Sequence, residues 1–219
     1  SRQVTEISGR AIAHTRPGNP APEPTSTTLA PAGTQGTATA QLSRWRSHSR
    51  GTSRGPMSPR STPAVNDGKV YVIDAQLCVF CFDAKDGKEV WKHDVMRENA
   101  GVNIKWSSAA SPVIDGNVLL LAGGGAGQAL LGLDKATGKP VWETPNPDKT
   151  PMSHSSIMPA EIGGVKQYLY MTIGGCVGVS VQDGKQLWSF PWKFNIAVPT
   201  SALHVGDGKI FLTSCYEAD

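Results

Sequence analysis

Hydrophobic and polar residues alternate along short stretches of the chain, and turn residues separate these stretches. Residues 69–74 place two valines on one face of a strand and a tyrosine and an isoleucine on the other. The pair Asp67-Gly68 precedes them, and Asp-Gly favours the positive φ angles of tight hairpin turns. The pattern predicts antiparallel strands over residues 62–65 and 69–74. Residues 78–83 and 89–93, around the turn Asp86-Gly87-Lys88, complete a four-stranded unit.

The chain repeats this unit. The motif Asp-Gly-Lys-Glu-Val-Trp ends at Trp91, and related motifs end at Trp142 and Trp188. Successive tryptophans are 51 and 46 residues apart. A second marker, serine, recurs every 45 residues, at Ser111, Ser156 and Ser201. A period of this length is typical of propellers and other repeat arrays.

Four strands per repeat predict an all-β protein, a β-propeller of four-stranded antiparallel blades. We expect blades at about residues 61–95, 108–146 and 153–192, and half of a fourth at 198–219. Since propellers close with about four to eight blades, the chain is expected to be part of a larger ring whose missing blades belong to a parent chain. Each recurring tryptophan is expected to wedge against the neighbouring blade, with Trp91 left exposed beside a missing one.

The composition changes near residue 60. Residues 1–60 hold eight arginines, no lysine and only five Leu, Ile, Val or Phe residues, together with seventeen Ser or Thr and seven prolines. So little apolar surface predicts a disordered segment, either a natural linker or out-of-frame sequence. A basic arm that contacts an anionic surface is an alternative. Residues 61–219 carry thirteen basic against sixteen acidic residues, so nucleic-acid binding is not expected there.

The tryptophan phrases have a family resemblance. Residues 82–91 and 133–142 resemble the tryptophan-docking repeat of the pyrroloquinoline-quinone (PQQ) propeller superfamily. That superfamily contains quinoprotein alcohol dehydrogenases and also non-enzymatic relatives, such as the outer-membrane assembly lipoprotein of the Bam machinery. The resemblance implies a bacterial protein of the periplasm or the extracellular space. No secretory signal or transmembrane span is visible in the sequence.

The segments between blades are the candidate binding sites. In a propeller these connections gather on one face around the central channel, so Trp106, His154 and Asn195 are expected to converge. The resemblance implies a stacking tryptophan and calcium-binding side chains there, which makes Trp106 and Asn195 the candidate cofactor residues. Ser107 and His154 are candidates for contacts with another ligand. Polar residues that cap loops around a water-filled channel are the alternative interpretation.

Two other motifs are not expected to be functional. Cys78 and Cys81 form a C-x-x-C pair without a second pair at ligand spacing, so buried thiols are expected instead of a metal site. The glycine-rich residues 123–127 lead into a strand and not into a helix, which predicts a hairpin connection in place of a phosphate loop.

Two functions follow from these features. The first is a binding or scaffold propeller without chemistry, with a protein or a small molecule bound at the channel face and no cofactor. The alternative is a fragment of a PQQ-dependent alcohol dehydrogenase that uses PQQ and calcium. Quinoprotein dehydrogenases carry two adjacent cysteines beside the quinone, and this chain has no such pair, which favours the first function.

Overall fold

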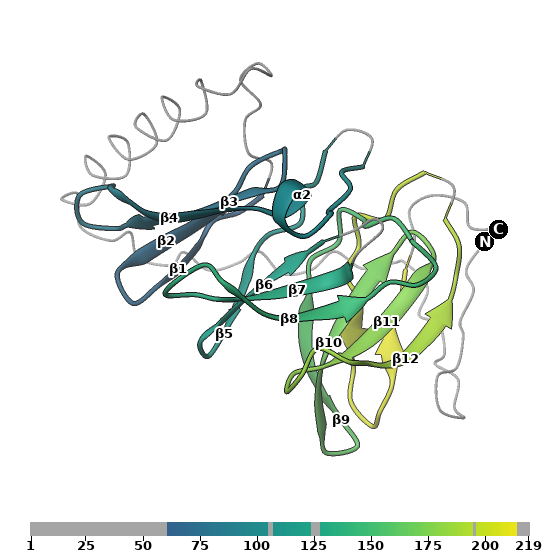
Figure 1. The fold of residues 1–219 in the computed structure, drawn as a ribbon. Helices are drawn as coiled ribbons and strands as arrows, with labels where there is room; N and C mark the ends of the chain where they lie inside the picture. Colours follow the sequence, from purple (N-terminus) through teal and green to yellow (C-terminus); the bar gives the residue numbers. More distant parts are fainter. Residues whose placement is uncertain (1–60, 105–106, 124–127, 195, 214–219) are drawn as a thin grey trace, which may run out of the picture.

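Three four-stranded sheets and one hairpin make up the computed structural model, which describes residues 61–104, 107–123, 128–194 and 196–213 (Figure 1). The first sheet contains β1 (Ala64–Asn66), β2 (Lys69–Ile73), β3 (Cys78–Asp83) and β4 (Glu89–Asp94). The second contains β5 (Val113–Asp115), β6 (Val118–Ala122), β7 (Gln128–Asp134) and β8 (Pro140–Pro145). The third contains β9 (Met158–Ile162), β10 (Val165–Thr172), β11 (Gly175–Ser180) and β12 (Gln186–Pro191). A fourth, two-stranded sheet pairs β13 (Leu203–His204) with β14 (Ile210–Phe211).

Each sheet is an antiparallel meander in which every strand pairs with the next one along the chain. The prediction of an all-β propeller with four-stranded blades is therefore confirmed. Tight turns join the last two strands of each four-stranded sheet, and their glycines Gly87, Gly138 and Gly184 have φ angles of 70°, 73° and 69°. Glycine adopts this left-handed conformation without steric cost, which explains why the Gly-Lys pair recurs at these turns.

The hydrophobic core lies between successive blades. The side of the first sheet that carries Tyr71 and Cys81 packs in one cluster with Leu119, Leu131 and Leu133 of the second sheet. The same arrangement recurs between the third sheet and β14, where Leu169 and Ile210 share a second cluster. We call the side of each blade that faces the next blade its leading face, and the opposite side its trailing face. The leading face of one blade packs against the trailing face of the next, and this contact repeats along the chain.

Two features of the connections refine the prediction. The polar stretch after the first blade contains a short helix, α2 (Val95–Glu98), which was not predicted. Asp94 caps this helix by accepting the Arg97 N–H, and Glu98 accepts the Asp94 N–H in return. The hairpin between β6 and β7 is confirmed by their antiparallel pairing, as expected for the glycine-rich connection.

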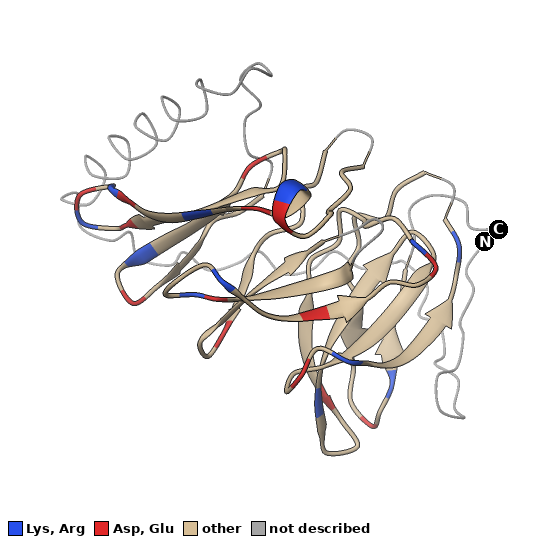
Figure 2. Ribbon diagram, viewed as in Figure 1, with Lys and Arg blue, Asp and Glu red and all other residues tan. Residues whose placement is uncertain are grey.

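Charged residues gather at the turns and on the outer strands, whereas the centres of the middle strands are mostly uncharged (Figure 2). In the part of the chain that the structure describes, no helix is long and apolar enough to cross a membrane. The predicted disordered segment, residues 1–60, lies outside the described residues.

Candidate functional site

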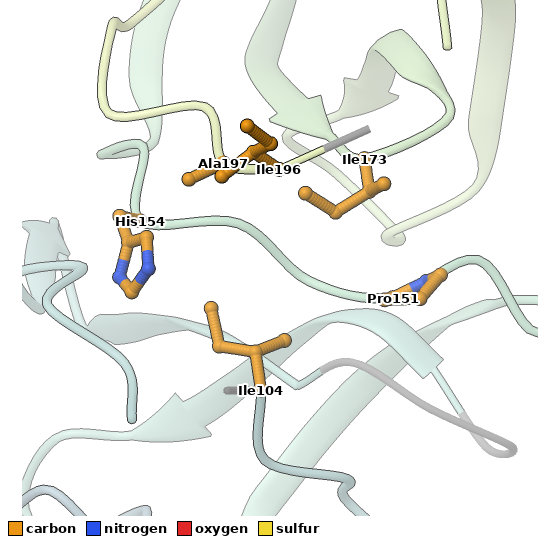
Figure 3. Close-up of a pocket in the computed structure, with 6 residues that line it drawn as sticks. All are labelled: Ile104, Pro151, His154, Ile173, Ile196 and Ala197. Carbon is orange, nitrogen blue, oxygen red and sulfur yellow. The ribbon is translucent and has the colours of Figure 1, made fainter. Parts of the chain in front are cut away.

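A pocket forms where the connections between blades come together. It has a volume of about 210 Å³. Its walls come from the connection before β5, the connection before β9, the β10–β11 turn and the connection after β12, and they comprise Ile104, Pro151, His154, Ile173, Ile196 and Ala197. The ring of His154 and the side chain of Ile104 point toward one another across this space (Figure 3). Segments that lie far apart in sequence therefore share one site.

The sequence-predicted site residues are distributed unevenly around this pocket. His154 lines it. Ser107 is buried but is not among the lining residues, and its N–H donates to the Ile104 carbonyl at 2.9 Å from a left-handed backbone with φ 64°. Trp106 and Asn195 lie outside the described residues. The ligand roles of all four residues remain predictions.

Aliphatic side chains dominate the pocket, and sequence reasoning did not single them out. Ile104, Ile196 and Ala197 belong to the predicted connection segments, while Ile173 lies in a turn between strands. Branched aliphatic residues carry no chemical signature in a sequence, so only their convergence in space marks them as a site. Ile196 is 52% exposed and forms an accessible rim.

The pocket-lining residues that the structure describes are not suited to binding PQQ and calcium. PQQ is a tricarboxylate, and His154 is the only side chain with a polar group among the described residues that line the pocket. Burying carboxylates against isoleucine and proline without compensating partners is costly. The volume also lies below the roughly 300–1,000 Å³ of typical cofactor pockets.

The indoles of the repeat phrase meet glycines of the next blade. A β-carbon at Gly138 would approach the Trp91 ring to 2.6 Å, and one at Gly184 would approach the Trp142 ring to 2.4 Å. Trp91 Nε1 also donates to the Lys135 carbonyl at 3.0 Å. Each turn glycine thus provides a flat surface on which the indole of the preceding blade can lie.

Trp188 differs from the other two tryptophans. Its Nε1 donates to Gln167 Oε1 of its own sheet at 2.6 Å. A second pocket, of about 300 Å³, lies beside it and is lined by Ile162, Val165, Gln167, Leu187, Trp188, Gly208 and Ile210. The expectation that Trp91 is the exposed tryptophan is wrong, because each indole points to the following blade and Trp91 therefore packs on the second sheet.

Polar contacts also join neighbouring blades. Tyr168 donates to Asp115 Oδ2 at 2.7 Å, from the third sheet to the second, and burial raises the pKa of this tyrosine. The periodic serines have a related role, since Ser111 Oγ accepts the Thr62 N–H and Ser201 Oγ accepts the Ser156 N–H. These serines therefore tie the start of one blade to the start of the next.

The cysteines are structural in character. Cys81 is a buried free thiol, which confirms the prediction for this residue, whereas Cys78 is only partly buried. Cys176 is also a buried free thiol. Burial raises the pKa of Cys176 to about 12, and that of Cys78 to about 12 as well. A thiol with such a pKa stays protonated and unreactive at neutral pH. Among the residues that the structure describes, no three His, Cys, Asp or Glu side chains group as a metal site would require.

The chain is similar in sequence to a known protein family. The sequence model of the family described as outer membrane protein assembly factor BamB matches residues 36–214. This match begins within the arginine-rich segment that precedes the first blade. No curated protein sequence matches the chain.

Several solved structures are similar to the chain. BamB from Moraxella catarrhalis is 16% identical with a TM-score of 0.43, over 61% of this chain and 37% of that one. Quinohemoprotein alcohol dehydrogenase from Comamonas testosteroni is 19% identical with a TM-score of 0.44, over 62% of this chain and 21% of that one. The computationally designed Ika4 protein is 12% identical with a TM-score of 0.46, over 73% of this chain and 93% of that one. The chain thus spans well under half the length of the two natural proteins.

Proposed function

Because the chain belongs to the family of the outer membrane protein assembly factor BamB, we propose that it is a non-catalytic binding propeller that holds a protein partner at the channel face. The family match confirms the superfamily resemblance inferred from the tryptophan phrases. It also supports a periplasmic or extracellular location and a partner that takes part in assembling outer-membrane proteins.

The observation that carries this proposal is the aliphatic lining of the 210 Å³ pocket. Ile104, Ile173 and Ile196 come from three different segments and offer a partner a small apolar socket with an exposed rim. A few residues that anchor in well-packed, desolvated pockets carry most of the binding energy at protein interfaces. His154 adds one polar group that can orient a partner's backbone by a hydrogen bond.

A matched pair of variants tests the proposal. Ile196 and Val141 are both 52% exposed, but Val141 lies on β8, away from the pocket. We expect Ile196→Asp to weaken binding of a purified outer-membrane assembly protein at least roughly tenfold, because a buried carboxylate without a partner is costly. Val141→Asp should bind as the unmodified chain does. Equal binding by both variants would contradict a binding site at the pocket.

The quinoprotein alternative is tested in parallel. The same protein is titrated with PQQ and Ca²⁺, and dye-linked alcohol oxidation is measured. We expect no saturable binding of PQQ and no oxidation above the blank. Stoichiometric PQQ binding together with alcohol oxidation would contradict the proposed binding function and support the alternative, a fragment of a PQQ-dependent dehydrogenase.

A further inference from the structure

A buried histidine joins the first blade to the helix α2. His93 lies on β4 and is 3% exposed, so both polar atoms of its ring need partners inside the protein. Nδ1 lies 3.2 Å from Oε2 of Glu98 on α2, and Nε2 lies 2.5 Å from Oδ1 of Asn99, which caps the end of α2. Asn99 Nδ2 in turn donates to Glu143 Oε1 of β8 at 2.5 Å. A chain of contacts therefore runs from the first blade through α2 to the second blade.

The two partners of His93 are both hydrogen-bond acceptors. An ionised carboxylate such as that of Glu98 only accepts hydrogen bonds. Because Nδ2 of Asn99 donates to the Glu143 carboxylate, its Oδ1 is the atom that faces His93. A neutral imidazole has one N–H and can donate to only one of these acceptors, whereas an imidazolium donates to both. The arrangement of acceptors therefore matches the protonated ring.

Other charged and titratable groups near the ring are already engaged or neutral. Asp94 follows His93 on β4, and its carboxylate accepts the Arg97 N–H and lies 3.4 Å from Arg97 Nε. On β3, the apolar Val79 lies opposite His93 and Cys78 lies opposite Asp94. Burial raises the pKa of Cys78 to about 12, so this thiol stays neutral. The charge of the ring is therefore balanced by the carboxylates of α2 and β8.

The next contact between blades has a different residue at the same position. His93 stands two residues after Trp91. Thr144 stands two residues after Trp142, is fully buried, and donates from Oγ1 to the Gly184 carbonyl beside the third sheet at 2.8 Å. A threonine hydroxyl keeps its charge state, whereas histidine changes charge between about pH 5 and 8. Of these two contacts, only the first can respond to pH.

We propose that protonated His93 is a pH-dependent latch that holds α2 between the first and second blades. When the ring loses a proton, one nitrogen presents a lone pair to an acceptor, and that contact becomes repulsive. The latch is therefore closed at acidic pH and opens as the pH rises through the range in which histidine titrates. Ala100 directly follows the helix cap with a φ of 51°, which is strained for a residue with a side chain, and opening allows it to relax. The proposal uses neither the pocket nor its partner, so it does not depend on the proposed function.

Amide hydrogen exchange of the full 219-residue chain measures the latch. The backbone N–H groups of Asn99 and Gly101 both donate to the Val95 carbonyl, at 3.2 and 3.0 Å, and serve as reporters of α2 and its cap. Their protection factors are corrected for the intrinsic pH dependence of exchange. We expect these factors to fall at least roughly tenfold between about pH 5.5 and 8.5, because a charge-assisted hydrogen bond is lost. The Gly184 N–H, which donates to the Ser180 carbonyl, should keep its protection.

Two substitutions distinguish a latch from a purely structural role. Glu98→Gln keeps an oxygen for the Asp94 N–H and offers a donor to Nδ1, so neutral His93 stays bound and protection should no longer fall at high pH. His93→Gln removes the titrating group, so the reporter amides should have the same protection at both pH values. His204→Gln, at a histidine on β13, should keep the full response. Far-UV circular dichroism confirms that the sheets of each variant are intact. Constant protection in the unmodified chain, or an unchanged pH response in either α2-latch variant, would overturn the proposal.

Discussion

Replacement of Gly184 by alanine tests the stacking of an indole on a turn glycine. The residue has a φ of 69°, and its new β-carbon would lie 2.4 Å from Cε3 of Trp142. The left-handed backbone alone costs roughly 1–2 kcal/mol for a residue with a side chain. Overpacking against the ring adds roughly 1–3 kcal/mol. We therefore expect Gly184→Ala to lower the free energy of unfolding by about 3 kcal/mol.

Two further variants separate the two costs. Gly116 has a φ of 56°, and a β-carbon added there would have no atom within 4 Å, so Gly116→Ala should cost only the backbone strain, about 1 kcal/mol. In a Trp142→Ala background the ring is gone, and Gly184→Ala should then cost about 1 kcal/mol as well. The double-mutant cycle should give a coupling of about 2 kcal/mol, which is typical of residues in direct contact.

Urea unfolding followed by far-UV circular dichroism measures the unmodified chain and all of these variants. If Gly184→Ala costs the same with and without Trp142, the indole does not pack on this turn and the inter-blade argument fails. The same holds if Gly184→Ala costs no more than Gly116→Ala.

Three other predictions concern single groups. Tyr168→Phe removes the 2.7 Å hydrogen bond to Asp115 between blades and should cost about 1.5 kcal/mol in urea unfolding; an unchanged midpoint would contradict that role. Since burial raises the pKa of Cys176 to about 12, its alkylation by iodoacetamide at pH 8 should be roughly 1,000-fold slower than that of an ordinary thiol, and a rate near that of glutathione would refute this. The hydrogen bond from Lys185 lowers the pKa of Asp183 to about 2, so its stabilising effect should be complete above about pH 4 and disappear as the pH falls toward 2. A ¹³C NMR titration with a midpoint near the ordinary value of about 4 would show that the ion pair does not form in solution.

Much of the fold follows from local signals in the sequence. The alternation of residues 69–74 and the Asp-Gly turns predict strand pairs, because side-chain direction and hairpin geometry depend on neighbours only a few residues away. The serines at 45-residue intervals, Ser111, Ser156 and Ser201, each precede the first strand of a sheet. The short helix α2 was missed, since four residues capped by Asp94 give almost no periodic pattern.

The contacts between blades depend on tertiary structure alone. The sequence marks Trp91 and Trp142 as repeated residues, but it does not state toward which neighbour each indole points. In the fold they meet Gly138 and Gly184 of the following blade, 47 and 42 residues further along the chain. This direction makes Trp188 the tryptophan beside an open pocket. The aliphatic pocket also depends on tertiary structure. Ile104, Ile173 and Ile196 become neighbours only because the packing of successive blades brings their connections to one face.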